Sequence, residues 1–305
     1  MKTKKLFILG VFIMAFMVTS KAQQLPLYSQ YMMNGFLLNP AIAGTVPYAP
    51  VCLTARMQWV GIKEAPQTFA VSGHTLLGRS QGVGGYIFND RFGPITRTGA
   101  LASYAYHVMI SNKSKLAFGV SLSAFQYTLD QTQLQLESDN IIDPSISQTK
   151  ESAFVPDANF GVYFYEEEKY FAGLSVAQLF QWNIDVGSVN QNKLVRHYFA
   201  TGGYRFGINK DFKIEPSVLA KATESAPIQV DINCKGFYKK NYWLGFSYRT
   251  DKSIIALLGV KYQNYYFGYA YDYTLSKISN YTTGSHEIII GINIGEKENR
   301  GSSLL

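Results

Sequence analysis

The sequence has little of three features that soluble or secreted domains commonly use. Charged residues make up 16% of its 305 residues, against about 25% in an ordinary soluble domain. Only two cysteines are present, too few for a disulfide framework in a chain of this length. Disorder is excluded as well, because 47% of the residues are apolar and 15% are aromatic, which is enough to bury a core.

After the first 22 residues, no apolar run approaches the length of a membrane helix. The first 22 residues combine lysines at positions 2, 4 and 5 with a 13-residue apolar stretch, Leu6–Val18, and the small residues Ser20 and Ala22. This pattern predicts a signal peptide cleaved after Ala22, because a spanning helix needs about 20 apolar residues. The mature chain would begin at Gln23, so no lipidated cysteine is expected there.

Cleavage would also remove much of the positive charge. Four lysines lie in the signal, so the formal net charge of +7 falls to +3. The remaining basic residues are scattered and form no patch or known binding motif. The sequence therefore gives no support for a nucleic-acid partner.

From Val51 onward the chain reads as short alternating segments separated by turn signals, without long helical periodicity. In Tyr265–Thr274, five aromatic residues occupy every second position, so they lie on one face of a strand. Similar rows occur in Leu116–Phe125, in Ile228–Lys235 and from His286. One face of each strand suits lipid and the other suits a polar interior.

Fourteen such segments can be counted, and single-chain bacterial outer-membrane barrels have an even number of strands. They begin near Val51, Gln67, Gln81, Thr98, Lys115, Ala158, Tyr170, Arg196, Phe212, Ile228, Tyr242, Ser253, Tyr265 and His286. We therefore predict an all-β fold, a transmembrane antiparallel β-barrel of about 14 strands over residues 51–294. Secreted β-sandwiches are the alternative, but their faces rarely carry five aromatic residues in one row.

The connections between these strands differ in length. As a set, the odd connections (the first, the third and so on) are longer than the even ones, as expected for outer loops when both termini are periplasmic. The two longest predicted insertions, Leu129–Asp157 and Phe180–Val195, are both odd connections. We therefore expect both on the outside of the cell.

The histidines give no sign of a metal or catalytic site. The four are His74, His107, His197 and His286. None has a second ligand at metal-like spacing. His74 shares a strand face with Ser72 and His107 shares one with Ser103, as in a barrel hydrolase, but no carboxylate that could orient them is identifiable. No cofactor, no metal and no enzyme activity are predicted.

Charged residues on the predicted interior faces are of mixed sign. They are Arg56, Lys213, Glu215, Asp231, Lys235, Arg249, Lys261, Asp272 and Glu287. The mixture favours a mutually paired network that braces the lumen over a selectivity lining. Cys52 is expected to face the lumen and Cys234 the lipid, so a disulfide between them is improbable.

Three runs near the mature N-terminus are more specific. They are QLPLYSQYMMNGFLLNPAIAGT at 24–45, ARMQWVGIKEAPQTF at 55–69 and YIFNDRFGPIT at 86–96. Together they resemble the PorP/SprF family of Bacteroidetes outer-membrane proteins, which is associated with type IX secretion and, in some species, gliding motility. The matching positions are Gln30, Tyr31, Asn34, Asn39, Pro40, Ala43, Gly44, Arg56, Gln58, Trp59, Gly61, Pro66, Thr68, Asn89, Asp90 and Gly93.

The resemblance implies an outer-membrane barrel that helps the export or surface attachment of large type IX substrates, such as gliding adhesins. It implies partners among those substrates and among the periplasmic or lipoprotein components of the machinery, and no enzyme activity. The matching positions are candidate partner contacts or structural residues. A plugged channel for small or hydrophobic solutes is the alternative function.

The segment before the first strand, Gln23–Pro50, contains the turn formers Asn39, Pro40 and Gly44. We expect it to be ordered, either as a plug inside the lumen or as a periplasmic docking surface. Trp59 would lie at the outer end of the first strand, where an aromatic residue can sit at the membrane interface. A polar tail, residues 295–305, follows the last strand and is expected in the periplasm.

Overall fold

The computed structural model describes residues 25–133, 149–184, 186, 192–224 and 226–296. The predicted signal peptide and most of the C-terminal tail lie outside these ranges. The strands are β1 (Ala49–Met57), β2 (Gln67–Leu77), β3 (Gln81–Phe92), β4 (Ile95–Met109), β5 (Ser114–Asp130), β6 (Lys150–Glu166), β7 (Tyr170–Ala177), β8 (Asn183–Ile184), β9 (Asn192–Lys193), β10 (His197–Tyr204), β11 (Phe206–Gly207), β12 (Phe212–Thr223), β13 (Ala226–Tyr238), β14 (Tyr242–Arg249), β15 (Ser253–Tyr262), β16 (Tyr265–Thr274) and β17 (Ser285–Ile294). Short 3₁₀ turns are η1 (Gly35–Leu37), η2 (Pro40–Ile42), η3 (Gln131–Gln133) and η4 (Lys277–Asn280).

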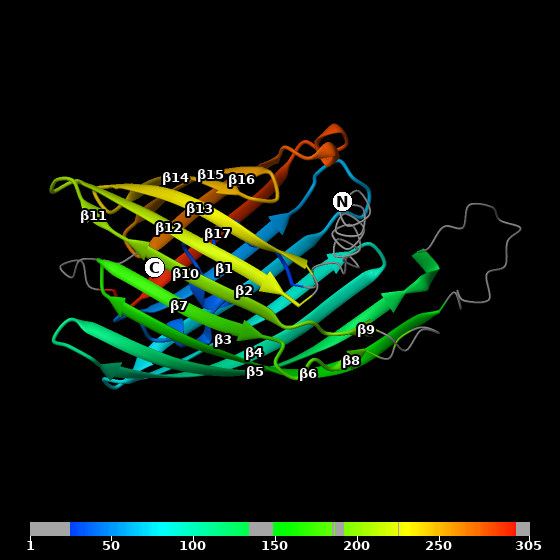
Figure 1. The fold of residues 1–305 in the computed structure, drawn as a ribbon, viewed down its shortest axis with the longest axis horizontal. Coiled ribbons are helices and arrows are strands. Elements are labelled where there is room, and N and C mark those ends of the chain that lie inside the picture. Colours follow the sequence, from blue (N-terminus) through cyan, green and yellow to red (C-terminus); the bar gives the residue numbers. More distant parts are fainter. Residues whose placement is uncertain (1–24, 134–148, 185, 187–191, 225, 297–305) are drawn as a thin grey trace, which may run out of the picture.

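In the described chain, fourteen antiparallel strands form one closed barrel (Figure 1). Neighbours in sequence are neighbours in the sheet, β1 pairs with β17, and β10 pairs with both β7 and β12. The short β11 continues β10 along β12, while β8 and β9 form a separate two-stranded ribbon. The predicted fold class and strand number are confirmed, and closure leaves the barrel strands without a free edge along the wall.

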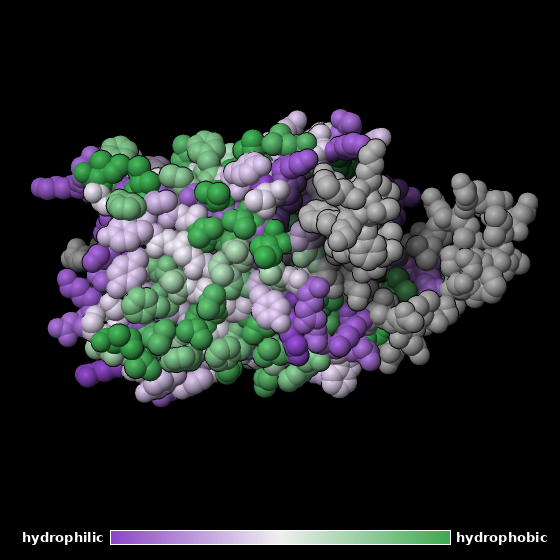
Figure 2. All heavy atoms as spheres, viewed as in Figure 1, coloured by the Kyte–Doolittle hydropathy of each residue, from purple (hydrophilic) through white to green (hydrophobic). Residues whose placement is uncertain are grey.

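The strands alternate between exposed and buried side chains, as the period-two pattern predicts. Outward-facing Leu122 and Leu174 are 71% and 64% exposed, whereas inward-facing Asp231 and Lys235 are fully buried. Figure 2 shows apolar side chains over the middle of the outer wall and hydrophilic ones at its left-hand end. None of the helical turns in the described ranges is long and apolar enough to cross a membrane.

The two ends of the barrel carry different connections. One, called here the β1–β2 end, carries the β1–β2, β3–β4, β5–β6, β7–β10, β12–β13, β14–β15 and β16–β17 connections. The other, the β2–β3 end, carries the remaining connections, the start of β1 and the end of β17. The longest connections all belong to the first set, as expected, but three of its members are as short as those at the other end, since only residues 93–94, 224–225 and 250–252 separate their strands.

Both ends of the first long insertion belong to strands. β5 continues to Asp130 and β6 begins at Lys150, and these two residues are paired in register. The expectation of a loop over Leu129–Asp157 is therefore wrong at both ends. Pro156, which suggested a turn, is tolerated because β6 pairs with β7 only from Phe160 onward, so a missing backbone donor is accommodated at this edge.

Described residues of the second insertion, Phe180–Val195, pack against this extension. Ile184, Val186 and Leu194 are buried against Phe125 and Val155 of β5 and β6. At the β1–β2 end the barrel wall is thus raised on one side, where β5 and β6 reach the right of the view in Figure 1.

Residues 25–48, called here the lumen segment, run through the interior of the barrel. Leu25 lines the same cavity as Pro66 and Asp251 at the β1–β2 end, and the segment leads into β1 at the β2–β3 end. Glu296 lies at the β2–β3 end, 2.5 Å from Lys261 Nζ. The first and last described residues therefore lie at opposite ends of the barrel. Both termini lie outside the described residues, so their placement on one side of the membrane stays a prediction.

Candidate functional site: the lumen segment and the vestibule

The lumen segment is fixed near the β1–β2 end by a buried arginine and two buried carboxylates. Arg56 Nη2 lies 3.1 Å from Asp272 Oδ2, and its Nη1 lies 3.2 Å from Glu287 Oε2. Arg56 also donates to Ser29 Oγ at 2.6 Å. Glu287 accepts the backbone N–H groups of Ser29 and Gln30 at 2.6 and 2.9 Å. The segment and the wall therefore share one charge-assisted network.

This network continues along the wall through Arg249. Its guanidinium lies 3.1 Å from an oxygen of Asp231 and 3.1 Å from Asp272 Oδ2. Lys221 Nζ lies 3.3 Å from Asp231 Oδ2 and 5.5 Å from the ring centre of Tyr31 in the lumen segment. Each charge is buried, and each has an opposite charge beside it, which is the arrangement that offsets the desolvation of a buried ion.

A second buried group lies nearer the β2–β3 end. Glu215 lies 3.0 Å from Lys235 and 2.5 Å from Arg205, and Lys235 also donates to the carbonyl oxygen of Met32 at 2.9 Å. The two other predicted interior lysines are paired as well, in Lys213–Glu168 and Lys261–Glu296. The prediction of a mutually paired interior network is confirmed for the described residues.

Two family-motif residues of the lumen segment bond directly to the wall. The Tyr31 hydroxyl donates to Asn233 Oδ1 at 2.9 Å, and Asn34 Nδ2 donates to Ser72 Oγ at 2.9 Å. Tyr31 is buried and Asn34 is half-buried. These contacts lie within one chain, so the structure gives both residues a role in seating the segment.

Asn39 and Pro40 start the η2 turn and hold it against β6 and β7. Asn39 Oδ1 accepts the backbone N–H of Ala41 at 2.9 Å, and Pro40 occupies the first position of the turn, where no donor is needed. Asn39 Nδ2 donates to the carbonyl oxygens of Val162 and Leu174 at 3.1 and 3.4 Å. The turn formers of the sequence thus form a short turn whose cap also bonds to the wall.

Residues 38–44 run across the inner face of the barrel wall, along a row of small residues that is called here the small-residue row. Its members are neighbours in register on five consecutive strands: Gly82, Ala105, Gly119, Gly161 and Ser175. A Cβ atom at Gly82 would lie 1.9 Å from the carbonyl oxygen of Ala43, and one at Gly119 would lie 2.2 Å from the nitrogen of Ala41. Glycine is required here because the two backbones touch.

Two histidines that share strand faces with serines bind the end of this crossing. Gly44, at a φ of +77° that favours glycine, donates its N–H to His74 Nδ1 at 3.2 Å. His107 Nε2 lies 2.8 Å from the carbonyl oxygen of Ala43, and its Nδ1 lies 3.0 Å from the Tyr165 hydroxyl. Both imidazoles therefore have a structural use, in seating the lumen segment.

The mouth of the barrel at the β1–β2 end holds a cavity of about 680 Å³, called here the vestibule. Gln58, Trp59, Pro66 and Asp90 line it together with the start of the lumen segment. Trp59 therefore lines the vestibule, and its place at the membrane interface stays a prediction. Burial raises the pKa of Asp251, another lining residue in the β14–β15 turn, against the opposing effect of Arg249.

Asp90 is the one acidic member of the motif and is buried beside the vestibule. It accepts from Thr68 Oγ1 at 2.6 Å and lies 2.5 Å from Arg97 Nη2. Gln58 donates its N–H to the carbonyl oxygen of Pro66 at 2.9 Å, closing the β1–β2 connection. These motif residues support the rim of the vestibule.

The remaining motif residues lie in or beside the connections at this end. Gly61 and Gly93 have φ values of +105° and +53°, and Gly93 donates its N–H to the carbonyl oxygen of Glu64 at 3.0 Å. Asn89, next to Asp90 in β3, donates to Thr98 Oγ1 at 2.7 Å. The motif therefore divides between the lumen segment and the rim of the vestibule.

Sequence reasoning missed three basic residues of the interior: Lys221, Arg205 and Arg97. Lys221 and Arg97 lie on the same strand faces as residues that were recognised, so a longer reading of β12 and β4 would have included them. Arg205 interrupts the strand pattern between β10 and β11 and gave no periodic signal.

Within the described ranges, no group of three or more His, Cys, Asp or Glu residues could hold a metal ion. As predicted, Cys52 is buried, Cys234 is exposed and both are free.

Comparisons with solved structures and with family models gave the following matches. One solved structure similar to the chain is the CymD monoaromatic hydrocarbon channel, with 11% identity, coverage of 86% of this chain and 91% of that chain, and a TM-score of 0.48. Another is the Pseudomonas putida toluene transporter TodX, with 9% identity, coverage of 85% of this chain and 94% of that chain, and a TM-score of 0.47. The KdgM porin is also similar, with 11% identity, coverage of 81% of this chain and 99% of that chain, and a TM-score of 0.38. No curated protein sequence matches. The family described as type IX secretion system membrane protein PorP/SprF matches residues 20–292. The chain belongs to this family of outer-membrane β-barrels.

Proposed function

We propose that this barrel acts as an accessory and anchoring component of type IX secretion, contributing to the export or surface attachment of large substrate proteins. Family membership supports the association with type IX secretion. The observation that carries the finer role is the occupied lumen, in which buried bonds from Ser29 to Gly44 fix the lumen segment to the wall. Because the lumen segment fills the interior of the barrel, the structure suits binding of partners at its two ends better than conduction through the lumen.

The β1–β2 end is the proposed contact surface for the substrate. It combines the vestibule with the raised wall of β5 and β6, where Phe154, Phe180 and Trp182 are 71%, 56% and 49% exposed. Phe154 is paired with Gln126 of β5. From Gln126 to the end of β5, the outward-facing residues are polar. Exposed aromatic residues beyond the apolar band are typical of protein interfaces. Periplasmic or lipoprotein components would contact the β2–β3 end. No enzyme activity is part of this proposal.

The test is a mild-detergent pull-down from native membranes with a tag placed after Leu305. A large surface protein or type IX component should co-purify, and it should be lost when Phe154 and Trp182 are both replaced by serine. Replacing Lys113 and Lys239, both exposed at the β2–β3 end, by serine is the matched control and should leave substrate recovery unchanged. Recovery of the barrel alone would contradict the anchoring role.

The alternative function, a plugged channel for small or hydrophobic solutes, makes a different prediction. Such a channel should conduct in planar bilayers, and more so after residues 25–48 are deleted. Conduction by the intact chain without any co-purifying protein would favour the channel.

A further inference from the structure

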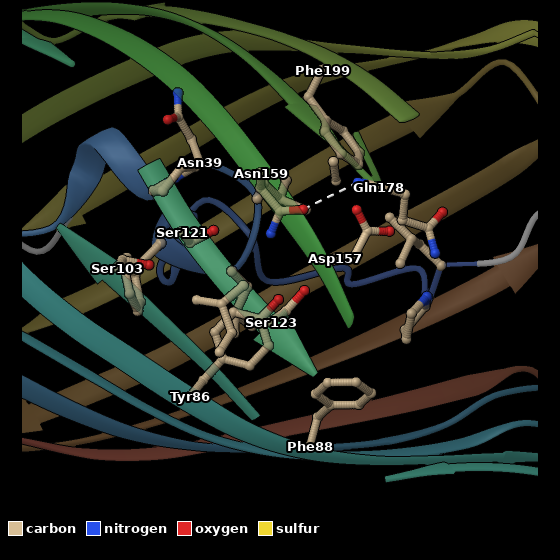
Figure 3. A pocket seen from close by; sticks show the side chains of 18 of the residues that line it. Asn39, Tyr86, Phe88, Ser103, Ser121, Ser123, Asp157, Asn159, Gln178 and Phe199 are labelled. Carbon is tan, nitrogen blue, oxygen red and sulfur yellow. Dashed lines mark hydrogen bonds between the residues drawn. The ribbon is translucent and has the colours of Figure 1, made fainter. Parts of the chain in front are cut away.

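A second cavity lies deeper in the barrel than the vestibule and has no assigned occupant. It measures about 80 Å³ and lies between the lumen segment and the wall formed by β3–β7 and β10 (Figure 3). Two rows of wall residues in register face it, one with Ser103, Ser121 and Asn159 and the next with Ser123 and Asp157. Leu25 and Pro26 line both this inner cavity and the vestibule, so the two cavities are adjacent.

Three buried polar atoms of the inner cavity have no hydrogen-bond partner in the structure. They are Ser103 Oγ, Ser121 Oγ and Asp157 Oδ2. Their residues are only 7%, 2% and 2% exposed. The other carboxylate oxygen, Asp157 Oδ1, accepts the backbone N–H groups of Ala158 and Phe180 at 2.7 and 3.0 Å. A buried polar atom without a partner is costly, and most costly when charged, so these atoms indicate a site for a hydrogen-bond donor.

The charge and shape of the cavity limit what that donor can be. Asp157 is the one residue with a charged side chain among the described residues that line it. The other walls are largely aromatic, from Phe36, Tyr86, Phe88, Phe125 and Phe199. A cation with an apolar body matches both features, because a carboxylate strengthens bonds to an ammonium group and aromatic faces attract cations.

We propose that the inner cavity binds a small organic amine in its ammonium form. The nitrogen donates to Asp157 Oδ2 and to the serine hydroxyls, and the apolar body packs against the aromatic walls. At 10–15 Å³ for each water-sized position, the volume holds about 5–8 such positions, which corresponds to one ring with a short amine arm. The proposal is independent of the anchoring role, because it rests on the cavity alone.

Benzylamine is the probe, and the full-length barrel in detergent is titrated with it by calorimetry at neutral pH, where the amine is cationic. Benzyl alcohol, which has the same size and no charge, should bind about tenfold or more weakly. The Asp157→Asn variant should lose a similar factor for benzylamine. Glu166→Gln, on the same strand at the other end of the barrel, is the matched control and should bind benzylamine as the wild type does.

A second variant keeps the test independent of any folding defect in Asp157→Asn. Ser121→Leu retains the carboxylate but fills the cavity, and it should also lose benzylamine binding. Heat-modifiable migration in gels establishes that each variant is a folded barrel. Equal binding of the amine and the alcohol, wild-type binding by both cavity variants, or no binding of benzylamine to the wild type would each overturn the proposal.

Discussion

Arg56 connects three acceptors that come from different parts of the chain. Its partners are Asp272 on β16, Glu287 on β17 and Ser29 in the lumen segment. Removing a single partner of a buried ion pair leaves the others as uncompensated buried charges, which is more costly than the net contribution of the pair itself. The stability of this barrel should therefore depend strongly on this one side chain.

We expect Arg56→Ala to lower the free energy of unfolding by about 3–5 kcal/mol, measured by urea titration of the detergent-solubilised barrel. Lys63→Ala is the control, because Lys63 is 76% exposed and lies 3.9 Å from Glu64, and exposed pairs contribute about 1 kcal/mol or less. Similar losses in the two variants would show that the Arg56 network does not stabilise the fold.

At the residue scale, period-two alternation predicted which charged side chains face inward, and Arg56, Arg249 and Glu287 are among them. It did not predict which charges meet, because partners come from strands far apart in the sequence. Nor did it show that His74 and His107 bind the lumen segment. Their acceptor and donor groups are backbone atoms of Ala43 and Gly44, which leave no side-chain signature.

At the scale of elements, the small-residue row decides how the lumen segment is seated. The backbone of residues 38–44 lies directly on this row, where a Cβ at Gly119 would also lie 2.4 Å from the carbonyl carbon of Pro40. Ser175, at the end of the row, donates its hydroxyl to the carbonyl oxygen of Leu38 at 2.7 Å. A larger side chain at Gly119 and the seated segment cannot occupy the same space.

The Gly119→Leu variant should therefore displace the lumen segment and leave the barrel folded. Overpacking of this kind costs about 1–3 kcal/mol. Here it destabilises the position of the lumen segment against the wall. In planar bilayers the variant should conduct more than the wild type. Gly207→Leu is the matched control, because a Cβ there meets nothing within 4 Å, and a rise in conductance equal to that of Gly119→Leu would refute the seating role of the row.

Strand positions were largely predictable from the sequence, whereas some connections were not. β1, β7 and β16 begin within two residues of the predicted starts. The β3–β4 and β12–β13 connections are tighter than expected because Ile95 and Ala226 already belong to strands. β6 begins eight residues earlier than predicted, since Pro156 and Asp157 resemble turn residues but lie in a paired strand.

At the scale of the whole molecule, the path of the lumen segment sets where the ends of the described chain lie. Leu25 lies at the β1–β2 end and Glu296 at the β2–β3 end. An orientation with the β2–β3 end in the periplasm would place the vestibule and the raised wall of β5 and β6 at the cell surface. That orientation is a prediction from connection lengths, and the anchoring role of the β1–β2 end depends on it.

Thiol labelling in intact cells measures the orientation directly. Both native cysteines are first replaced by alanine, and Lys63→Cys in the β1–β2 connection or Lys113→Cys in the β4–β5 connection then supplies a single exposed thiol. A membrane-impermeant maleimide should label the Lys63→Cys variant in intact cells and the Lys113→Cys variant only after the outer membrane is permeabilised. The reverse pattern would place the vestibule in the periplasm, where it would face the secretion machinery rather than a surface-attached substrate.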